Sequence, residues 1–285
     1  MNLSKYRNRH INYLNDDFIR IDMETDDIQL LSNDKLKEIN IYYPNQAQID
    51  HLPSILTNRI VAVNIWGGNY NNCKSFEKLE SLEYISIHNN SKLDSLWQIE
   101  CNDNLKGLGV IDCNKIQSIN FVEGLTNLKE LHIAGSIWKK QNINTLRPIS
   151  NLKKLIYLSL TQLNIEDADH YPLSALQSVE ELVLSENMFT TDQFAELAVF
   201  MIGTKCRCFK GYTELKEIYS DPTKCSDNRV QIVGSRKPEL DPKTQSKKIE
   251  KYILEFNNLK KKIQQAHNKW YEIRLAIAAS APYHS

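Results

Sequence analysis

Residues 82–90 read Leu-Glu-Tyr-Ile-Ser-Ile-His-Asn-Asn, with aliphatic side chains at the first, fourth and sixth places. The same spacing occurs seven times, at intervals of 24, 22, 23, 23, 27 and 24 residues, and all 21 positions are Leu, Ile or Val. The copies are Leu36, Ile39, Ile41; Ile60, Val63, Ile65; Leu82, Ile85, Ile87; Leu105, Leu108, Val110; Leu128, Leu131, Ile133; Leu155, Leu158, Leu160; and Val179, Leu182, Leu184. The alternation predicts a short strand with one buried face in each copy. The period predicts a solenoid, because one unit cannot bury its apolar row without stacked neighbours.

A small polar or thiol residue occupies the ninth place of four copies. These residues are Asn90, Cys113, Ser136 and Asn187. The pattern L-x-x-L-x-L-x-x-N/C resembles the leucine-rich-repeat family over residues 18–200. The resemblance implies that the ninth residue bonds backbone groups at the turn after each strand. Pro44, Gly68 and Leu163 depart from the pattern, which predicts irregular turns in repeats one, two and six.

The expected fold class is α/β: a leucine-rich-repeat solenoid, shaped as a short horseshoe with a parallel sheet on its concave face, a small capping module and a long C-terminal amphipathic helix. The expected boundaries are an N-terminal cap over 1–35, about seven repeats over 36–202, a Cys-containing capping module over 203–244, and the helix and tail over 245–285. Apolar residues between Asp17 and Met23 predict an irregular N-terminal capping strand.

Charge and hydropathy exclude several classes of protein. The chain balances 35 Lys and Arg against 35 Asp and Glu, so no net field attracts nucleic acid or an anionic membrane. Lys5, Arg7 and Arg9 are followed by no apolar stretch like that of a secretory signal, and no run of 18 apolar residues occurs. We therefore expect a cytoplasmic protein with no membrane partner.

Six cysteines are too few for a disulfide scaffold in a chain of 285 residues. Cys206, Cys208 and Cys225 invite a zinc-site interpretation, but structural zinc requires four ligands and a fourth cysteine is missing. We expect free thiols, no metal ligands and no cofactor.

Residues 247–279 show helical spacing of coiled-coil type. The apolar seam consists of Ile249, Tyr252, Phe256, Leu259, Ile263, Ala266, Trp270, Ile273 and Ile277. The seam can pack on the solenoid flank, on a second copy in a homo-oligomer, or on a helix of a partner. The lysines around Lys261 make the helix basic, which fits either a solvated polar face or nucleic-acid binding.

The residues between the buried aliphatics should point into the concave face, and no Lys or Arg is found among the 21 of them. This face should therefore repel a phosphate backbone, so we expect no nucleic acid there. Glutamates favour a basic partner, and clustered aromatics are typical of protein-binding hot spots. Gly107 and Gly109 leave either a notch for the partner or room for neighbouring side chains. The candidate partner-binding residues are Tyr42, Trp66, Tyr84, His88, Glu130, His132, Tyr157, Glu181 and, on the segment after the fifth strand, Trp138.

No phosphate-cradling loop, nucleophile elbow, H-E-x-x-H helix or dinucleotide fingerprint is present, so we expect no enzymatic or catalytic residues. The predicted function is a non-enzymatic module that binds a protein partner on its concave face. The chain resembles small bacterial intracellular leucine-rich-repeat proteins, which implies an inhibitor or immunity role. The alternative is a metal- or nucleic-acid-binding protein that acts through Cys206–Arg274.

Overall fold

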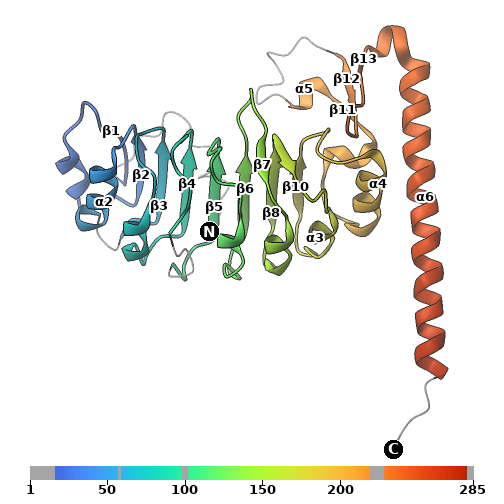
Figure 1. The fold of residues 1–285 in the computed structure, drawn as a ribbon, viewed down its shortest axis with the longest axis horizontal. Coiled ribbons are helices and arrows are strands. Elements are labelled where there is room, and N and C mark those ends of the chain that lie inside the picture. The colour runs from blue at the N-terminus through green and yellow to red at the C-terminus, as the bar shows by residue number, and fades with distance from the viewer. Residues whose placement is uncertain (1–16, 57–58, 98–101, 219–227, 281–285) are drawn as a thin grey trace, which may run out of the picture. The chain divides into compact units, whose positions relative to one another are not determined.

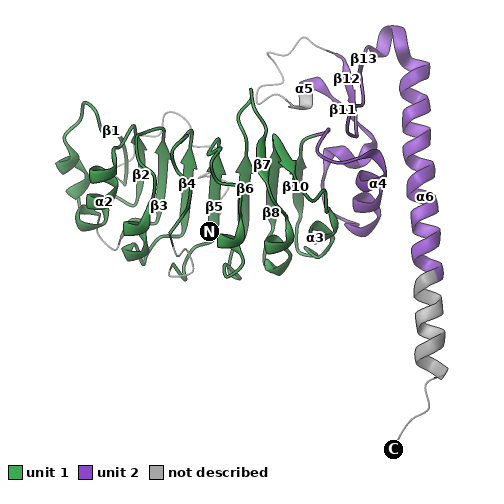
Figure 2. Ribbon diagram, in the orientation of Figure 1, with its two compact units in different colours: residues 1–185 green, residues 186–285 purple. Residues whose placement is uncertain are grey.

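The computed structural model describes residues 17–56, 59–97, 102–218 and 228–280, with side chains described as far as Lys269 except for those of Glu217 and Ile218. The chain divides into two compact units, residues 1–185 and residues 186–285. Figure 2 colours unit 1 green and unit 2 purple. Trp270, Ile273 and Ile277 of the predicted seam, as well as Cys101 and Cys225, lie outside the residues whose side chains are described.

Unit 1 is built around a parallel sheet of eight strands that lie side by side (Figure 1). The strands are β1 Phe18–Asp22, β2 Glu38–Tyr42, β3 Ala62–Trp66, β4 Tyr84–His88, β5 Gly107–Ile111, β6 Glu130–Ala134, β8 Tyr157–Thr161 and β10 Glu181–Leu184. Seven of them fall on the seven copies of the sequence pattern, and they pair in chain order. The predicted repeat solenoid is confirmed.

The aliphatic residues that define the repeat form the core of unit 1. All 21 are buried, with exposed fractions of 3% or less. The eighth strand, β1, pairs in parallel with β2, so that Ile19 lies beside Ile39 and Ile21 beside Ile41. The segment predicted to cap the solenoid is therefore a regular strand that extends the sheet by one row.

Short helical and extended segments return the chain from one strand to the next between most of the strands of the sheet. They are η1 Ile28–Ser32, α2 Gln46–Ile55, η2 Lys74–Lys78, η4 Asn120–Val122, β7 Gln141–Ile143, η5 Arg147–Asn151, β9 Leu163–Ile165 and α3 Tyr171–Ser174. They place apolar side chains such as Ile49, Phe76 and Leu173 in the core with no exposed surface. Trp97 is also buried and packs edge-on against Phe76, with 5.6 Å between ring centroids.

The ninth residue of the repeat bonds the backbone where the side chain is polar. The Oδ1 atom of Asn90 accepts hydrogen bonds from the amides of Lys92 and Leu93, at 2.8 and 2.9 Å. Its Nδ2 group donates to the carbonyl of Tyr70 at 3.1 Å. Cys113 makes only weak contacts with carbonyls, such as that of Ile111 at 3.6 Å. The turn after the third repeat strand is thus held by one buried side chain.

The turns that depart from the pattern have their own structure. Gly68 has φ +100, and a Cβ there would lie 2.4 Å from the carbonyl oxygen of Pro44, so only glycine fits. The amide of Asn69 donates to that carbonyl at 2.7 Å. Leu163 begins β9, which pairs in parallel with β7 to form a separate two-stranded sheet.

Unit 2 combines helices with a small antiparallel sheet. Its elements are α4 Thr191–Phe200, η6 Arg207–Lys210, β11 Tyr212–Glu214, α5 Leu215–Ile218, β12 Val230–Ile232, β13 Glu239–Leu240 and α6 Pro242–Ser280. The sheet order is β11-β12-β13. A side-chain cap at Thr190 starts α4, because its hydroxyl accepts from the amide of Gln193 at 3.3 Å.

The long helix predicted from residue 247 onward is found as α6, and it starts five residues earlier, at Pro242. Within unit 2 its first half packs through Ile249 and Phe256, which are 8% and 1% exposed. Ile249 shares a cluster with Val230 and Leu240 of the small sheet. Farther along the seam, Ala266 is exposed. The apolar seam is therefore covered at its start and open at the last seam residue whose side chain is described.

Candidate interaction surface

The side chains that alternate with the buried rows of unit 1 point away from the core, and we call the surface they form the concave face. The strand register aligns them in three columns. The columns are Phe18, Glu38, Ala62, Tyr84, Gly107, Glu130, Tyr157, Glu181; Arg20, Asn40, Asn64, Ser86, Gly109, His132, Ser159, Val183; and Asp22, Tyr42, Trp66, His88, Ile111, Ala134, Thr161. Eight of the nine predicted partner-binding residues lie in these columns.

Three aromatic rings stack in the third column, and we call them the aromatic stack: Tyr42, Trp66 and His88. The rings of Trp66 and His88 are nearly parallel, at 9°, with centroids 3.8 Å apart. The rings of Tyr42 and Trp66 are inclined by 12°, with centroids 6.2 Å apart. All three side chains are partly exposed. The sheet register brings the three rings together, since each belongs to the last residue of one of three neighbouring strands.

Side chains of the second column form hydrogen bonds next to the aromatic stack. The Nδ2 group of Asn64 donates to Oδ1 of Asn40 at 2.9 Å. The Ser86 hydroxyl and Nε2 of His88 are 2.5 Å apart and share a hydrogen bond. Because Ser86 is only 1% exposed, it fixes the orientation of the His88 ring from below. The His88 ring is thus held in one orientation on the surface, and a surface held in this way binds at a lower entropic cost than a mobile one.

Tyr84 lies in the first column and is 5% exposed. A Cβ at Gly107 would lie 2.4 Å from the Tyr84 ring, and a Cβ at Gly109 would lie 2.4 Å from the Ser86 hydroxyl. The two glycines therefore make room for side chains of the neighbouring strand. Of the two interpretations of these glycines, the relief of crowding is the one found, and Tyr84 offers little surface to a partner.

The carboxylates of the concave face differ in exposure. Glu38, at the β2 end of the first column, is 4% exposed. Glu130 and Tyr157 are partly exposed, and Glu181 on β10 is exposed. His132 is also partly exposed and lies in the middle column of β6. Glu130, Tyr157 and Glu181 are direct neighbours across three strands, so two of the accessible carboxylates lie toward the β10 end of the sheet, while Asp22, which is partly exposed, lies at the β1 edge.

Trp138 lies on the turn between β6 and β7 and not on the sheet. Its side chain is 89% exposed, and that of its neighbour Ile137 is 80% exposed. The Ser136 hydroxyl accepts from the amides of Trp138 and Lys139, at 3.2 and 3.0 Å, which fixes the turn. The structure therefore separates Trp138 from the other predicted residues, while it presents the indole fully to solvent.

Three residues that β1 contributes to this surface were missed by the sequence analysis, namely Phe18, Arg20 and Asp22. Because β1 is a regular strand, Arg20 joins the second column beside Asn40, and it is exposed. Its guanidinium carbon lies 4.3 Å from the centroid of the Tyr42 ring, at cation–π distance. The concave face thus carries one arginine at its β1 edge, whereas the 21 residues predicted to form this face include none.

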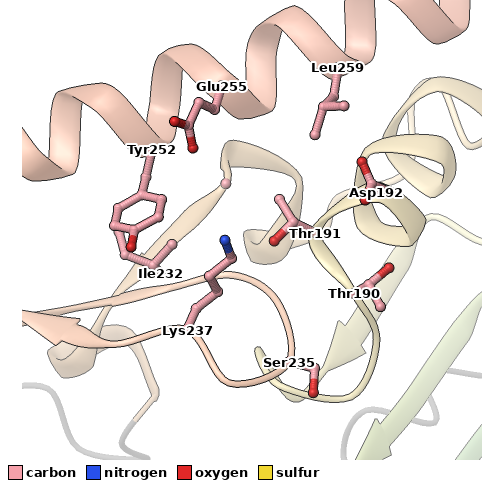
Figure 3. A pocket seen from close by; sticks show the side chains of 10 residues that line it. Thr190, Thr191, Asp192, Ile232, Ser235, Lys237, Tyr252, Glu255 and Leu259 are labelled. Atoms are coloured by element: carbon pink, nitrogen blue, oxygen red, sulfur yellow. The ribbon is translucent and has the colours of Figure 1, made fainter.

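Unit 2 contains a second candidate, a cleft of about 270 Å³ at the start of α4 (Figure 3). Its walls carry hydroxyls, one amine and two carboxylates. The lining residues are Thr190, Thr191, Asp192, Gly211, Ile232, Ser235, Lys237, Tyr252, Glu255 and Leu259. Lys237 is engaged with the Tyr252 ring, 5.0 Å from its centroid. The mixture of Lys237 with Asp192 and Glu255 does not favour one sign of ligand charge.

Cys206 and Cys208 are hydrogen-bonded to each other and lie near the ion pair of Arg207 and Glu186, in which Nε and Oε1 are 2.8 Å apart. The pKa of Cys206 is lowered, first because it is hydrogen-bonded to Cys208, and the nearby Arg207 acts in the same direction. The pKa of Cys208 is raised, first by the same hydrogen bond and then by burial. In the described part of the chain, no three His, Cys, Asp or Glu side chains gather as metal ligands would.

Selective alkylation should reveal this difference between thiols. At about pH 7.5, we expect iodoacetamide to modify Cys206 well before Cys73 and Cys113, because only thiolate reacts. Burial raises the pKa of Cys113 to about 12, and it raises that of Cys73 as well. Peptide mapping by mass spectrometry over time checks the order. Equal rates in the folded protein would contradict it, and unfolding in urea should make the rates converge.

No family model and no curated protein matches the chain. Among solved structures it is similar to an internalin, InlF, from Listeria monocytogenes, at a TM-score of 0.50 and 19% identity over 63% of this chain. It spans half of the length of that internalin, since the match covers 50% of it. Internalin C2 of the same organism matches at a TM-score of 0.47 and 17% identity, over 62% of this chain and 72% of that one.

A leucine-rich-repeat protein of Leptospira interrogans matches at a TM-score of 0.47 and 22% identity, over 62% of this chain and 43% of that one. At these identities the likeness concerns the fold alone. Separately, among the described residues none of the helices combines the length and the apolar character needed to traverse a bilayer.

Proposed function

We propose that this leucine-rich-repeat protein is a non-enzymatic interaction module that binds a protein partner on its concave face. The single observation that supports this most is the aromatic stack, a set of three partly exposed rings held parallel on adjacent strands. Aromatic side chains fixed in this way supply large contact areas at little entropic cost, and they are enriched in binding hot spots.

The proposed partner has a basic surface. Glu130 and Glu181 place accessible carboxylates on the face, at the end of the sheet opposite to Arg20. A partner with Lys or Arg near one end and an apolar or aromatic group near the other would complement both regions. Trp138, on its fixed turn, is proposed as an additional contact for a partner that extends beyond the sheet.

The finer proposal is an inhibitor or immunity role in the cytoplasm, in which the module covers the active surface of a toxin. It rests on the resemblance to small bacterial leucine-rich-repeat proteins.

The alternative is metal or nucleic-acid binding through residues 206–274. The basic character of α6 supports the alternative, since its Lys261 and Lys262 are exposed. Lysines on a protein surface are, however, ordinarily exposed.

A comparison of variants tests the proposal. We expect the triple variant Tyr42→Ala, Trp66→Ala, His88→Ala to lose about a hundredfold in affinity for the partner, because it removes the whole stack. The partner is first captured from native cytoplasm by the wild-type protein and identified. Its dissociation constant for both proteins is then measured by calorimetry, after circular dichroism has shown that both are folded.

The matched control is Leu30→Ala, Tyr171→Ala, which removes exposed apolar surface outside the three columns, where these side chains are 52% and 56% exposed. Its affinity should equal that of the wild type. Equal affinity of all three proteins would reject the concave face. Binding of zinc or of an oligonucleotide in a salt-sensitive manner, with no protein partner, would favour the alternative.

A further inference from the structure

Two cysteines of unit 2, Cys206 and Cys208, are separated by a single residue. The thiol of Cys208 donates a hydrogen bond to the sulfur of Cys206, so the two Sγ atoms lie side by side. Backbone hydrogen bonds also hold this segment, since the carbonyls of the two cysteines accept from the amides of Phe209 and Gly211 at 3.2 Å each. The contact between the sulfur atoms is therefore part of an ordered turn.

The two thiols differ in their access to solvent. Cys206 precedes η6 and is partly exposed, whereas Cys208 lies within η6 and has no exposed surface. The η6 helix packs against α4 and β11 of the same unit. A small dissolved reagent therefore reaches the sulfur of Cys206 and not that of Cys208.

The surroundings favour a thiolate at Cys206 and a protonated thiol at Cys208. A hydrogen bond stabilises negative charge on the sulfur that accepts it, which lowers the pKa of Cys206 and raises that of Cys208. The guanidinium of Arg207 also lowers the pKa of Cys206, and burial raises that of Cys208 further. An accessible thiolate beside a second thiol is the arrangement found in cysteines that are oxidised reversibly.

We propose that Cys206 and Cys208 form a site of reversible oxidation by hydrogen peroxide, in which Cys206 is the attacking sulfur and Cys208 the resolving one. The site lies in unit 2, and its chemistry needs no partner on the concave face of unit 1. It therefore goes beyond the proposed function and does not depend on it.

The oxidation proceeds in two steps. The Cys206 thiolate attacks one oxygen of the peroxide; an S–O bond forms, the O–O bond breaks, and the hydroxide that leaves takes a proton from water. The Cys208 sulfur then attacks the sulfenic sulfur of Cys206; the S–S bond forms, the S–O bond breaks, and hydroxide leaves with the proton of Cys208 as water. Two thiols thus give two electrons to one peroxide. An external dithiol reverses the reaction and is itself oxidised to a disulfide.

Peptide mapping of the full-length protein tests the proposal. The protein is treated with hydrogen peroxide, alkylated with iodoacetamide in urea and digested with a protease that cleaves after glutamate. Residues 197–214 then form one peptide, whose only cysteines are Cys206 and Cys208. We expect this peptide to lose two hydrogens and to take up no iodoacetamide, at a rate independent of protein concentration. Treatment with dithiothreitol should restore two thiols that iodoacetamide modifies.

Serine variants assign the roles of the two sulfur atoms. In Cys208→Ser the sulfenic acid at Cys206 has no resolving thiol, so we expect about tenfold more adduct with dimedone than in the wild type. In Cys206→Ser, Cys208 should be oxidised at less than about a tenth of the wild-type rate. The matched control is Cys225→Ser, which removes another thiol of residues 186–285 and should leave the wild-type result unchanged.

The mapping of the wild-type protein can overturn the proposal without any variant. It does so if the pair is oxidised no faster than the buried thiol of Cys73. It also does so if Cys206 becomes a sulfinic acid while Cys208 remains a thiol, or if either residue forms its disulfide with a different peptide.

Discussion

Replacing Ile87 with Asp is expected to unfold unit 1. Ile87 has no exposed surface and lies in β4 between Ile65 of β3 and Val110 of β5. Loss of a buried Ile side chain costs about 2–5 kcal/mol, and an unpaired carboxylate in its place adds a desolvation penalty of several kcal/mol more. The sum reaches the total stability of an ordinary domain, about 5–15 kcal/mol. Urea denaturation followed by far-ultraviolet circular dichroism measures the effect.

The matched control is Ile137→Asp, at a side chain that is 80% exposed on the turn after β6. We expect a change within about 0.5 kcal/mol there, since nothing buried is lost. The comparison isolates burial from residue type, because the same exchange is made at both positions. A folded Ile87→Asp variant with a wild-type urea midpoint would contradict the assignment of the core.

The second large effect is expected in unit 2, where Phe256→Ala should cost about 3–5 kcal/mol. Phe256 is 1% exposed and is the most buried residue of α6 among those whose side chains are described. Gly211, with φ +84, lies against its ring so closely that a Cβ would be 2.8 Å from the Cγ atom. The cavity left by Ala would therefore be bounded by backbone that cannot move in to fill it.

Hydrogen exchange shows which part of the protein Phe256→Ala destabilises. Amides of α6 around residues 249–263 should exchange much faster, whereas the strands of unit 1 should keep their protection. The control is Leu254→Ala, on the same helix at a side chain that is 61% exposed, with an expected change below about 0.5 kcal/mol. Uniform acceleration across both units would mean that Phe256 supports the whole chain and not α6 alone.

The repeat rows were predictable because they obey one periodic rule. Each inward position needs an aliphatic side chain, so a spacing search finds all seven strands. The strand β1 was seen only as an irregular cap, since the residue three places before Ile19 is Asp16 and the template fails there. For that reason the predicted surface did not include Arg20. Ile19 and Ile21 nevertheless show the alternation of buried residues that is typical of a strand.

Contacts between strands could not be read from the chain in the same way. The roles of Gly107 and Gly109 depend on Tyr84 and Ser86 of the neighbouring strand, more than twenty residues earlier. The pairing of β7 with β9 joins two segments of three residues each, which are too short to carry a period. The stacking geometry of Trp66 with His88 likewise required the observed register.

That register has a consequence for the evolution of the chain. In each strand the residue types at inward positions are constrained by packing in the core. The residue types at outward positions are constrained by their neighbours in a column and by any molecule that binds the face. Tyr42, Trp66 and His88 touch one another across positions that are 24 and 22 residues apart. Among descendants of this gene, substitutions at these three positions should therefore be correlated with one another and independent of those at Ile65 or Ile87. A lineage can in this way alter the proposed binding surface while it inherits the scaffold intact.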